Sequence, residues 1–182
     1  MLIKICLSGD GGQGVQLISD IICLAAFVDG WQVSQIPNYG LEQRGGVSLS
    51  FIKISDQEIT YPKFSQPDIL LIMSAQARER TKRYSEISNI QFPASNQIQN
   101  PNVKGENIKI LDIENYKDIL HKENIKFLNY NIFFLGLLSK ILEEKNICKI
   151  DEVVGLLEKK LIDKAGWNEN KRAFEIGVDI EY

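Results

Sequence analysis

Cysteine and histidine are scarce in this sequence of 182 residues, which has three cysteines and one histidine. No two cysteines form a C-x-x-C pair, and none lies near His121. A structural zinc site or a cysteine-bound iron–sulfur cluster needs about four ligands, so the sequence predicts neither. Unpaired cysteines also favour a reducing, cytoplasmic environment. Cys6 lies in a predicted strand and Cys23 on a predicted helix, and both are expected to be small residues of the hydrophobic core.

Long apolar runs and an excess of positive charge are missing as well. The most apolar long segment, residues 127–142, is too short to span a membrane and contains three polar side chains, so it predicts a buried helix. The first residues enter a strand without a basic and then an apolar stretch, so no signal peptide is expected. A net charge of −3 argues against nucleic acid as a partner. The polar stretch around His121 predicts a solvated helix face, and nothing supports a Ser-His-Asp or Cys-His arrangement.

Composition and periodicity predict one α/β domain. The hydrophobic share of 44% and the charged share of 25% are those of a soluble globular protein, and the length fits a single domain over residues 1–182. Residues 2–7 are typical of a buried strand, residues 15–28 have apolar side chains at helical spacing, and residues 31–36 alternate as a strand does. Together they predict a strand–helix–strand unit with parallel strands.

The rest of the chain continues the alternation of strands and helices. Strands are expected at 47–54, 59–61, 68–73 and 108–113, a hairpin turn at 55–58, helices at 75–84, 116–122, 129–144, 150–160 and 168–177, and a polar excursion with room for an irregular strand near 90–92 between residues 85 and 107. The predicted fold class is α/β: an open, mostly parallel Rossmann-like sheet with flanking helices and a C-terminal helical region.

A glycine-rich turn follows the first strand. It consists of Gly9, Gly11, Gly12, Gln13 and Gly14 and has G-x-G-x-x-G spacing. Such a turn lets a helix N-terminus approach a phosphate closely. A nicotinamide dinucleotide site also needs an acidic residue where the second strand ends, but residues 35–37 carry no carboxylate, and the turn lacks the Lys-Ser/Thr ending of a Walker loop. Two interpretations stay open: binding of an anion or phosphate, and close packing of the helix against the strand.

A second glycine-rich segment follows the second predicted strand. Its candidate site residues are Tyr39, Gly40, Glu42, Gln43, Arg44, Gly45 and Gly46. In a parallel arrangement this segment lies at the same carboxyl edge as the first turn, where open α/β sheets bind ligands. Its aromatic ring, carboxylate, amide and cation favour a site or an interface. A structural loop in which Glu42 pairs with Arg44 is the alternative.

The two glycine-rich segments resemble those of one family when they are taken together with Tyr61-Pro62 and residues 67–71. The combination is similar to the gamma subunit, or gamma domain, of 2-oxoacid:ferredoxin oxidoreductases, which act on pyruvate, 2-oxoglutarate, 2-oxoisovalerate or indolepyruvate. Residues 129–142 and 172–177 also resemble the C-terminal part of this family, so the likeness covers most of the chain.

The resemblance implies a role inside a complex. Enzymes of this family cleave a 2-oxoacid oxidatively with thiamine diphosphate and Mg²⁺, pass electrons through iron–sulfur clusters to ferredoxin, and release CO₂ and an acyl-CoA. It implies that the cofactors belong to alpha, beta and ferredoxin-like delta subunits, and that the gamma subunit completes the assembly near the coenzyme A approach. The two glycine-rich segments would then form a coenzyme A edge or an interface. The chain itself, with no metal site and no catalytic residue of its own, is expected to be inactive alone.

Two alternatives to this function stay open. The chain is either a purely structural assembly subunit with vestigial loops, or a free-standing nucleotide-binding module. Its length, without a fused ferredoxin segment, favours the 2-oxoglutarate type of gamma subunit.

Overall fold

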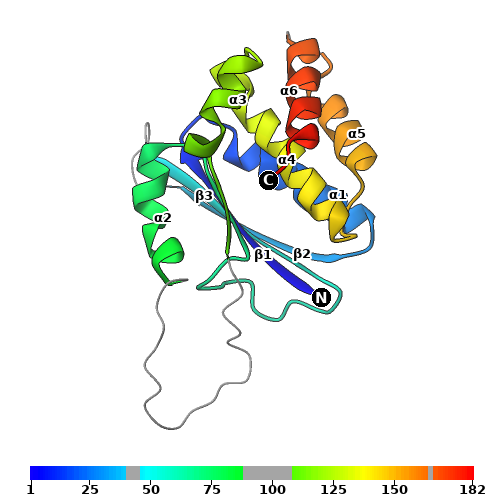
Figure 1. Cartoon of the computed structure of the whole chain (residues 1–182). Coiled ribbons are helices and arrows are strands. Elements are labelled where there is room, and N and C mark those ends of the chain that lie inside the picture. Colours follow the sequence, from blue (N-terminus) through cyan, green and yellow to red (C-terminus); the bar gives the residue numbers. More distant parts are fainter. Residues whose placement is uncertain (40–45, 88–107, 164–165) are drawn as a thin grey trace.

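The computed structural model describes residues 1–39, 46–87, 108–163 and 166–182, and its elements follow the predicted order (Figure 1). The strands are β1 (Leu2–Asp10), β2 (Gln32–Tyr39), β3 (Val47–Ser55), β4 (Ile69–Ile72) and β5 (Lys109–Asp112). The helices are α1 (Val15–Val28), α2 (Ala75–Ile87), α3 (Lys117–Lys122), α4 (Tyr130–Glu144), α5 (Ile150–Leu161) and α6 (Trp167–Asp179), with short 3₁₀ turns η1 (Ile113–Tyr116) and η2 (Phe127–Asn129).

The five strands form one mixed sheet in the order β2-β3-β1-β4-β5. β1 is parallel to β4, and β4 is parallel to β5, whereas β3 is antiparallel to both of its neighbours, β1 and β2. Four strands therefore run in one direction, which confirms the predicted open, mostly parallel α/β sheet. β1 and β2 point the same way, as predicted, but β3 lies between them.

The predicted return strand at residues 59–61 is wrong, because the chain forms no strand between β3 and β4. Both edges of β3 are already paired, with β1 on one side and β2 on the other, so a hairpin partner has no free edge to join. The segment is held instead by Lys53, whose Nζ donates a hydrogen bond of 2.5 Å to the carbonyl of Tyr61. The irregular strand expected near residues 90–92 lies outside the described residues.

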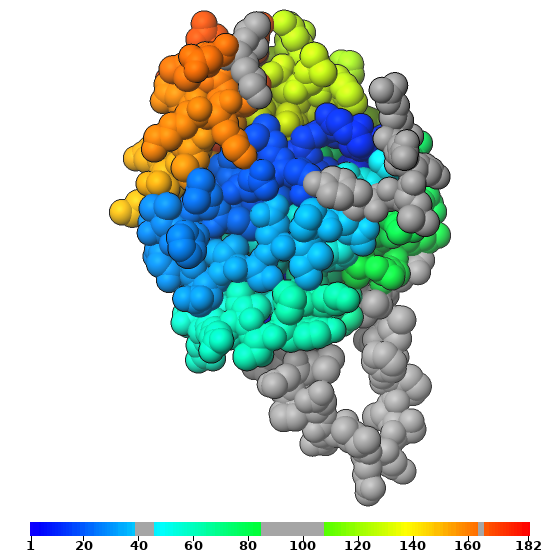
Figure 2. Space-filling view, turned by 180° about the vertical axis from the view of Figure 1, so that it is seen from behind, coloured from blue at the N-terminus to red at the C-terminus, as the bar shows by residue number. Residues whose placement is uncertain are grey.

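The two faces of the sheet are covered unequally (Figure 1). α2 lies on one face, against a small cluster that includes Cys6 and Leu70, while α1, α4, α5 and α6 build the larger core on the other face. Side chains alternate between the two faces of the sheet along β1. Cys6 therefore belongs to the small cluster, whereas Ile5 and Leu7 belong to the larger core. Seen from behind, α1 and β2 (blue) lie between α5 (orange) and the turquoise segment that follows β3 (Figure 2).

α4 is the buried helix that the sequence predicts, and residues 132–139 are all buried. The prediction is wrong for the first two residues of the apolar segment, because Phe127 is 61% exposed and Leu128 is 83% exposed. Both lie in η2, before the helix begins. None of the helices in the described ranges has both the length and the apolar character that crossing a lipid bilayer requires.

α4 and α6 pack backbone to backbone. A Cβ atom built on Gly136 of α4 would lie 2.2 Å from the carbonyl oxygen of Phe174, and one built on Gly177 of α6 would lie 2.0 Å from that of Phe133. Real Cβ contacts do not reach such distances, so only glycine allows the two helices to approach this closely.

All three cysteines are buried and unpaired, which confirms the expectation that Cys6 and Cys23 belong to the core. Burial raises the pKa of each thiol, including that of Cys148, to about 12. His121 is exposed on α3, as expected for a solvated helix face. Within the described ranges, no three His, Cys, Asp or Glu side chains come together as a metal site would require.

Candidate functional site at the carboxyl edge of the sheet

The two glycine-rich segments meet at the carboxyl edge of the sheet. β3 runs opposite to β1, so Val47 at its start faces Asp10 at the end of β1. Just beyond this pair, the backbone N–H of Gly11 donates a hydrogen bond of 2.9 Å to the carbonyl of Gly46. The structure thus brings together the described ends of the two predicted segments. The predicted site residues Gly40, Glu42, Gln43, Arg44 and Gly45, and the side chain of Tyr39, lie outside the described residues.

Gln13 stabilises the first turn from inside. Its Oε1 accepts a hydrogen bond of 2.7 Å from the backbone N–H of Asp10, and its Nε2 donates one of 3.3 Å to the carbonyl of Met73. Gly9 leaves room for this arrangement, because a Cβ there would lie 2.8 Å from Gln13 Oε1 and 2.9 Å from the end of the Met73 side chain. Gln13 therefore joins β1 to the end of β4 and is not available to bind a ligand.

Gly12 and Gly14 both have a left-handed backbone, with φ of 94° and 78°, but their surroundings differ. Nothing lies within 4 Å of a Cβ built on Gly12, which is exposed. A Cβ built on Gly14, the N-cap of α1, would lie 2.2 Å from Nδ2 of Asn131 on α4. The first turn of α4 therefore lies against the N-terminus of α1. The glycine spacing indicates a close approach here, but the sequence alone does not identify its partner.

Three backbone N–H groups of the first turn are hydrogen-bonded within the protein. The N–H groups of Asp10, Gly11 and Gln13 donate to Gln13 Oε1, Gly46 and the Asp10 carbonyl. A phosphate site needs several free N–H groups that converge on the anion, and the carboxylate of Asp10 would repel it. Of the two interpretations that the sequence leaves open, these contacts favour close packing.

Asp10 links the first turn to α2. Its carboxylate accepts a hydrogen bond of 2.6 Å from the hydroxyl of Ser74, and this hydroxyl accepts one of 3.0 Å from the N–H of Ala77. Ser74 therefore acts as the N-cap of α2. The sequence prediction did not include Ser74 in the site, although a serine directly before a helix is a recognisable capping signal.

Arg78 and Asp112 connect α2 to the end of β5. The Nε and Nη2 atoms of Arg78 donate hydrogen bonds of 2.7 Å and 2.6 Å to the two carboxylate oxygens of Asp112. Burial alone would raise the pKa of Asp112, but the hydrogen bonds from Arg78 and from the Glu114 N–H, together with the charges of Arg78 and Lys117, outweigh it and hold the pKa below its usual value. Both charges are used to join two elements, and neither is free to act on a ligand.

An exposed apolar pair lies close to the turn. Phe127 and Leu128 precede α4, whose residue Asn131 contacts Gly14, and the ring of Phe127 packs edge-on against Tyr130 with centroids 5.4 Å apart. Large apolar side chains exposed side by side mark contact sites for other proteins. The sequence prediction missed them because it assigned both to a buried helix.

Comparison with known proteins gives a consistent result over the whole chain. The family model of pyruvate ferredoxin/flavodoxin oxidoreductase matches residues 4–180. The 2-oxoglutarate synthase subunit KorC of Methanocaldococcus jannaschii is 32% identical over 185 residues, which cover 97% of this chain and 92% of that protein.

Two solved structures show the same fold. The gamma subunit of keto/oxoacid ferredoxin oxidoreductase from Geobacter sulfurreducens superimposes with a TM-score of 0.64 at 23% identity, over 97% of this chain and 96% of that chain. The 2-oxoglutarate:ferredoxin oxidoreductase of Magnetococcus marinus, solved with 2-oxoglutarate, coenzyme A and succinyl-CoA bound, has a TM-score of 0.71 at 19% identity. That match covers 97% of this chain but only 30% of the longer one.

Proposed function

The chain belongs to the pyruvate ferredoxin/flavodoxin oxidoreductase family, and on this premise we propose that it serves as the gamma subunit of a multisubunit 2-oxoacid:ferredoxin oxidoreductase. The observation that carries the proposal is the match to a KorC subunit over nearly the full length of both proteins. The complex would convert a 2-oxoacid to an acyl-CoA and CO₂ while it reduces ferredoxin. The same match supports one gamma-type domain over residues 1–182, and 2-oxoglutarate as the substrate.

The cofactors of such a complex would be held by other subunits. We assign thiamine diphosphate, Mg²⁺ and the iron–sulfur clusters to alpha, beta and ferredoxin-like delta subunits, and we place the complex in the cytoplasm. The described residues of this chain do not fit a cluster, because all three cysteines are buried with their pKa values raised to about 12. They also do not form a complete coenzyme A site, because three N–H groups of the first turn and the cation of Arg78 already have protein partners.

We assign the carboxyl edge to an interface with a partner subunit, next to the coenzyme A approach. Residues 9–14 and 39–46 would line this edge, and Phe127 and Leu128 would extend it as the apolar contact. Support comes from the Gly11–Gly46 hydrogen bond, which joins the two segments, and from the exposure of the apolar pair beside them.

A purely structural subunit is the second candidate, and the internal hydrogen bonds of the first turn favour it. A free nucleotide-binding module has less support. In a dinucleotide-binding fold the second strand is adjacent to the first, and a carboxylate at its end holds the ribose. Here β3 separates β1 from β2, and Gln35 of β2 donates a hydrogen bond of 2.9 Å to Asp20. Negligible affinity for NAD is therefore expected.

Anaerobic affinity purification tests the proposal. The tagged chain, expressed in its own source cells, should co-purify with partner subunits in a fixed ratio, and the complex should be brown and reduce a viologen dye when a 2-oxoacid and coenzyme A are added. Recovery of the chain alone, colourless and without partners, would contradict the proposal and leave the free module as the better account.

A further inference from the structure

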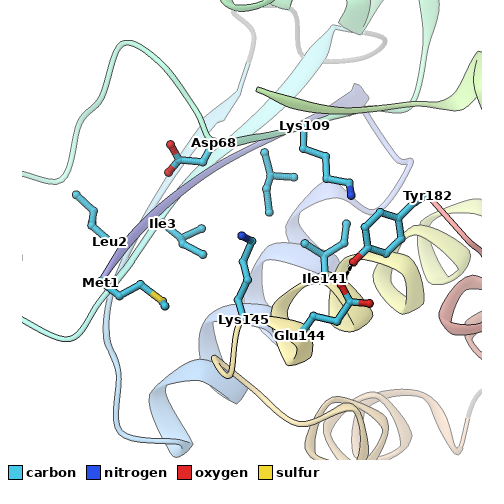
Figure 3. A pocket seen from close by; sticks show the side chains of 10 residues that line it. Met1, Leu2, Ile3, Asp68, Lys109, Ile141, Glu144, Lys145 and Tyr182 are labelled. Atoms are coloured by element: carbon cyan, nitrogen blue, oxygen red, sulfur yellow. Dashed lines mark hydrogen bonds between the residues drawn. The ribbon is translucent and has the colours of Figure 1, made fainter. Parts of the chain in front are cut away.

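A second concave feature lies at the amino edge of the sheet, at the opposite end from the glycine-rich turns (Figure 3). It is a cavity of about 600 Å³, bounded by the first residues of β1, β4 and β5, by the end of α4 and by the C-terminal residue Tyr182. This volume lies in the range of sites that bind small molecules. Nothing in the proposed gamma-subunit role uses this cavity.

The floor of the cavity is apolar. Ile3 of β1, Ile69 of β4 and Ile141 of α4 line it, and their exposed fractions are 6%, 2% and 2%. These side chains belong to the larger core, on the face of the sheet that α4 covers. The floor is therefore closed, and the exposed apolar surface at the cavity comes from Met1 and Leu2, which are 58% and 50% exposed.

Two ammonium groups point into the cavity above this floor. Lys109 begins β5, Lys145 follows α4, and Figure 3 shows both side chains directed inward from opposite sides. In the described part of the chain, neither forms an ion pair with a carboxylate. Lys109 instead lies over the ring of Tyr182, with its Nζ 3.2 Å from the ring centroid.

The carboxylates at the cavity already have partners. Asp68 accepts a hydrogen bond of 2.6 Å from the backbone N–H of Lys4 and pairs with its Nζ at 3.2 Å, and Glu144 accepts a hydrogen bond from the hydroxyl of Tyr182. The pKa of Lys109 is lowered, mainly by burial and further by the charge of Lys145, against the opposing effect of Glu144. Lys109 and Lys145 are thus near each other, with Glu144 beside them, so an anion held by the two ammonium groups must keep away from the Glu144 carboxylate.

We propose that this cavity binds a small amphiphilic organic anion, whose carboxylate or phosphate lies between Lys109 and Lys145 and whose apolar body lies against Met1 and Leu2. Charge-assisted hydrogen bonds from two ammonium groups hold the anionic end. Contact with Met1 and Leu2 selects ligands that carry an apolar body over inorganic anions, because it removes exposed apolar surface from water.

Isothermal titration of the purified full chain with octanoate tests this site, with uncharged octanol and inorganic phosphate as comparison ligands. Octanoate should bind saturably at one site. Octanol, which lacks the negative charge, and phosphate, which lacks the apolar body, should each bind at least about tenfold more weakly. Lys109→Met combined with Lys145→Met should weaken octanoate binding by about tenfold or more. Lys122→Met, which removes an exposed lysine on α3, should leave it unchanged.

Lys145→Glu keeps the test decisive if the double variant fails to fold, because Lys145 is exposed and forms no ion pair with the residues that the structure describes. It should abolish octanoate binding and lower the melting temperature of the free chain by no more than about 4 °C, because it adds one acidic residue at the end of α4. Equal affinity of octanoate for Lys145→Glu and the unmodified chain would overturn the proposal, as would the absence of saturable binding. Tighter binding of phosphate than of octanoate would also overturn it. All arms use the chain alone, so their outcome does not depend on the proposed complex.

Discussion

The backbone N–H of Gly11 and the carbonyl of Gly46 are joined by a hydrogen bond of 2.9 Å at the carboxyl edge of the sheet. The contact exists because β3 is reversed, so that the start of β3 lies beside the end of β1. The first turn and the described end of the second segment, which are distant in the sequence, are therefore joined in the structure. A substitution that distorts the first turn should also disturb the start of the second segment.

Gly12→Ala and Gly14→Ala form a matched pair in the first turn. Both place a side chain at a left-handed φ, which should lower the free energy of unfolding by about 1–2 kcal/mol. Gly14→Ala should lower the free energy of unfolding by about 1 kcal/mol more than Gly12→Ala does, because Asn131 must move away from the added Cβ. Urea denaturation of the free chain measures both. Adding Asn131→Ala to Gly14→Ala should recover the extra loss, and equal losses for Gly12→Ala and Gly14→Ala would show that the Asn131 contact is unimportant.

Gly177→Ala should be one of the most damaging small substitutions. The added Cβ would lie 2.0 Å from the backbone carbonyl of Phe133, so α6 must move away from α4, at a cost of about 3 kcal/mol in unfolding free energy. Gly155→Ala on α5 is the control, because nothing lies within 4 Å of its Cβ. It should stabilise the chain by about 0.5–1 kcal/mol through helix propensity alone. Thermal unfolding curves that shift in the same direction for both variants would contradict the α4–α6 packing.

The three cysteines should not react with iodoacetamide in the native chain near neutral pH. The thiolate is the reactive form, and burial raises the pKa of all three thiols to about 12, so they stay protonated until the pH approaches that value. Mass spectrometry should find no adduct on the folded chain and three adducts after unfolding in urea. Rapid modification of one thiol in the folded chain would mean that this thiol is accessible to solvent and not buried.

Local patterns predict the elements of this fold well but not their arrangement. α1 begins and ends at the predicted residues, because apolar side chains repeat at helical spacing from Val15 and Gly30 follows the helix end. The alternation in residues 47–54 predicts a strand but cannot identify its partners, since strand pairing depends on contacts far apart in the sequence. Because β3 lies between β1 and β2, it has no unpaired edge to which the predicted strand at residues 59–61 could bind.

In the candidate site, too, local patterns predict the elements but not which residues contact one another. Glycine spacing predicts the first turn, but not that Asn131 is the neighbour that requires Gly14, nor that Gln13 faces inward. Apolar composition predicts burial of Phe127 and Leu128, which the folded chain leaves exposed. Their exposure follows from their position in η2, before α4 begins, and local apolar composition does not predict such a position.

Arg44→Ala tests whether the second glycine-rich segment takes part in function. Arg44 lies outside the described residues. We expect the free energy of unfolding of the free chain to change by less than about 0.5 kcal/mol. In the assembled enzyme, turnover should fall or the coenzyme A requirement should rise, because a charge-assisted contact is lost. Arg80→Ala, at an exposed arginine on α2, is the control and should change neither quantity.

Glu42 is the main confounding residue for that test, since it is a candidate partner of Arg44. A double-mutant cycle with Glu42→Gln separates pairing within the segment from contact with a ligand or subunit. If Arg44→Ala destabilises the free chain but leaves the kinetics of the assembled enzyme intact, the segment is structural and the second candidate function is favoured.

Reconstitution of the enzyme from separated subunits tests the gamma-subunit function most directly. The chain alone should be colourless and inactive with every 2-oxoacid. Partner subunits prepared without it should show little coenzyme A-dependent reduction of ferredoxin, and one equivalent of the chain should restore the rate with 2-oxoglutarate. The account is contradicted if the chain alone shows a cluster spectrum and reduces ferredoxin, or if the partner subunits are fully active and do not bind it.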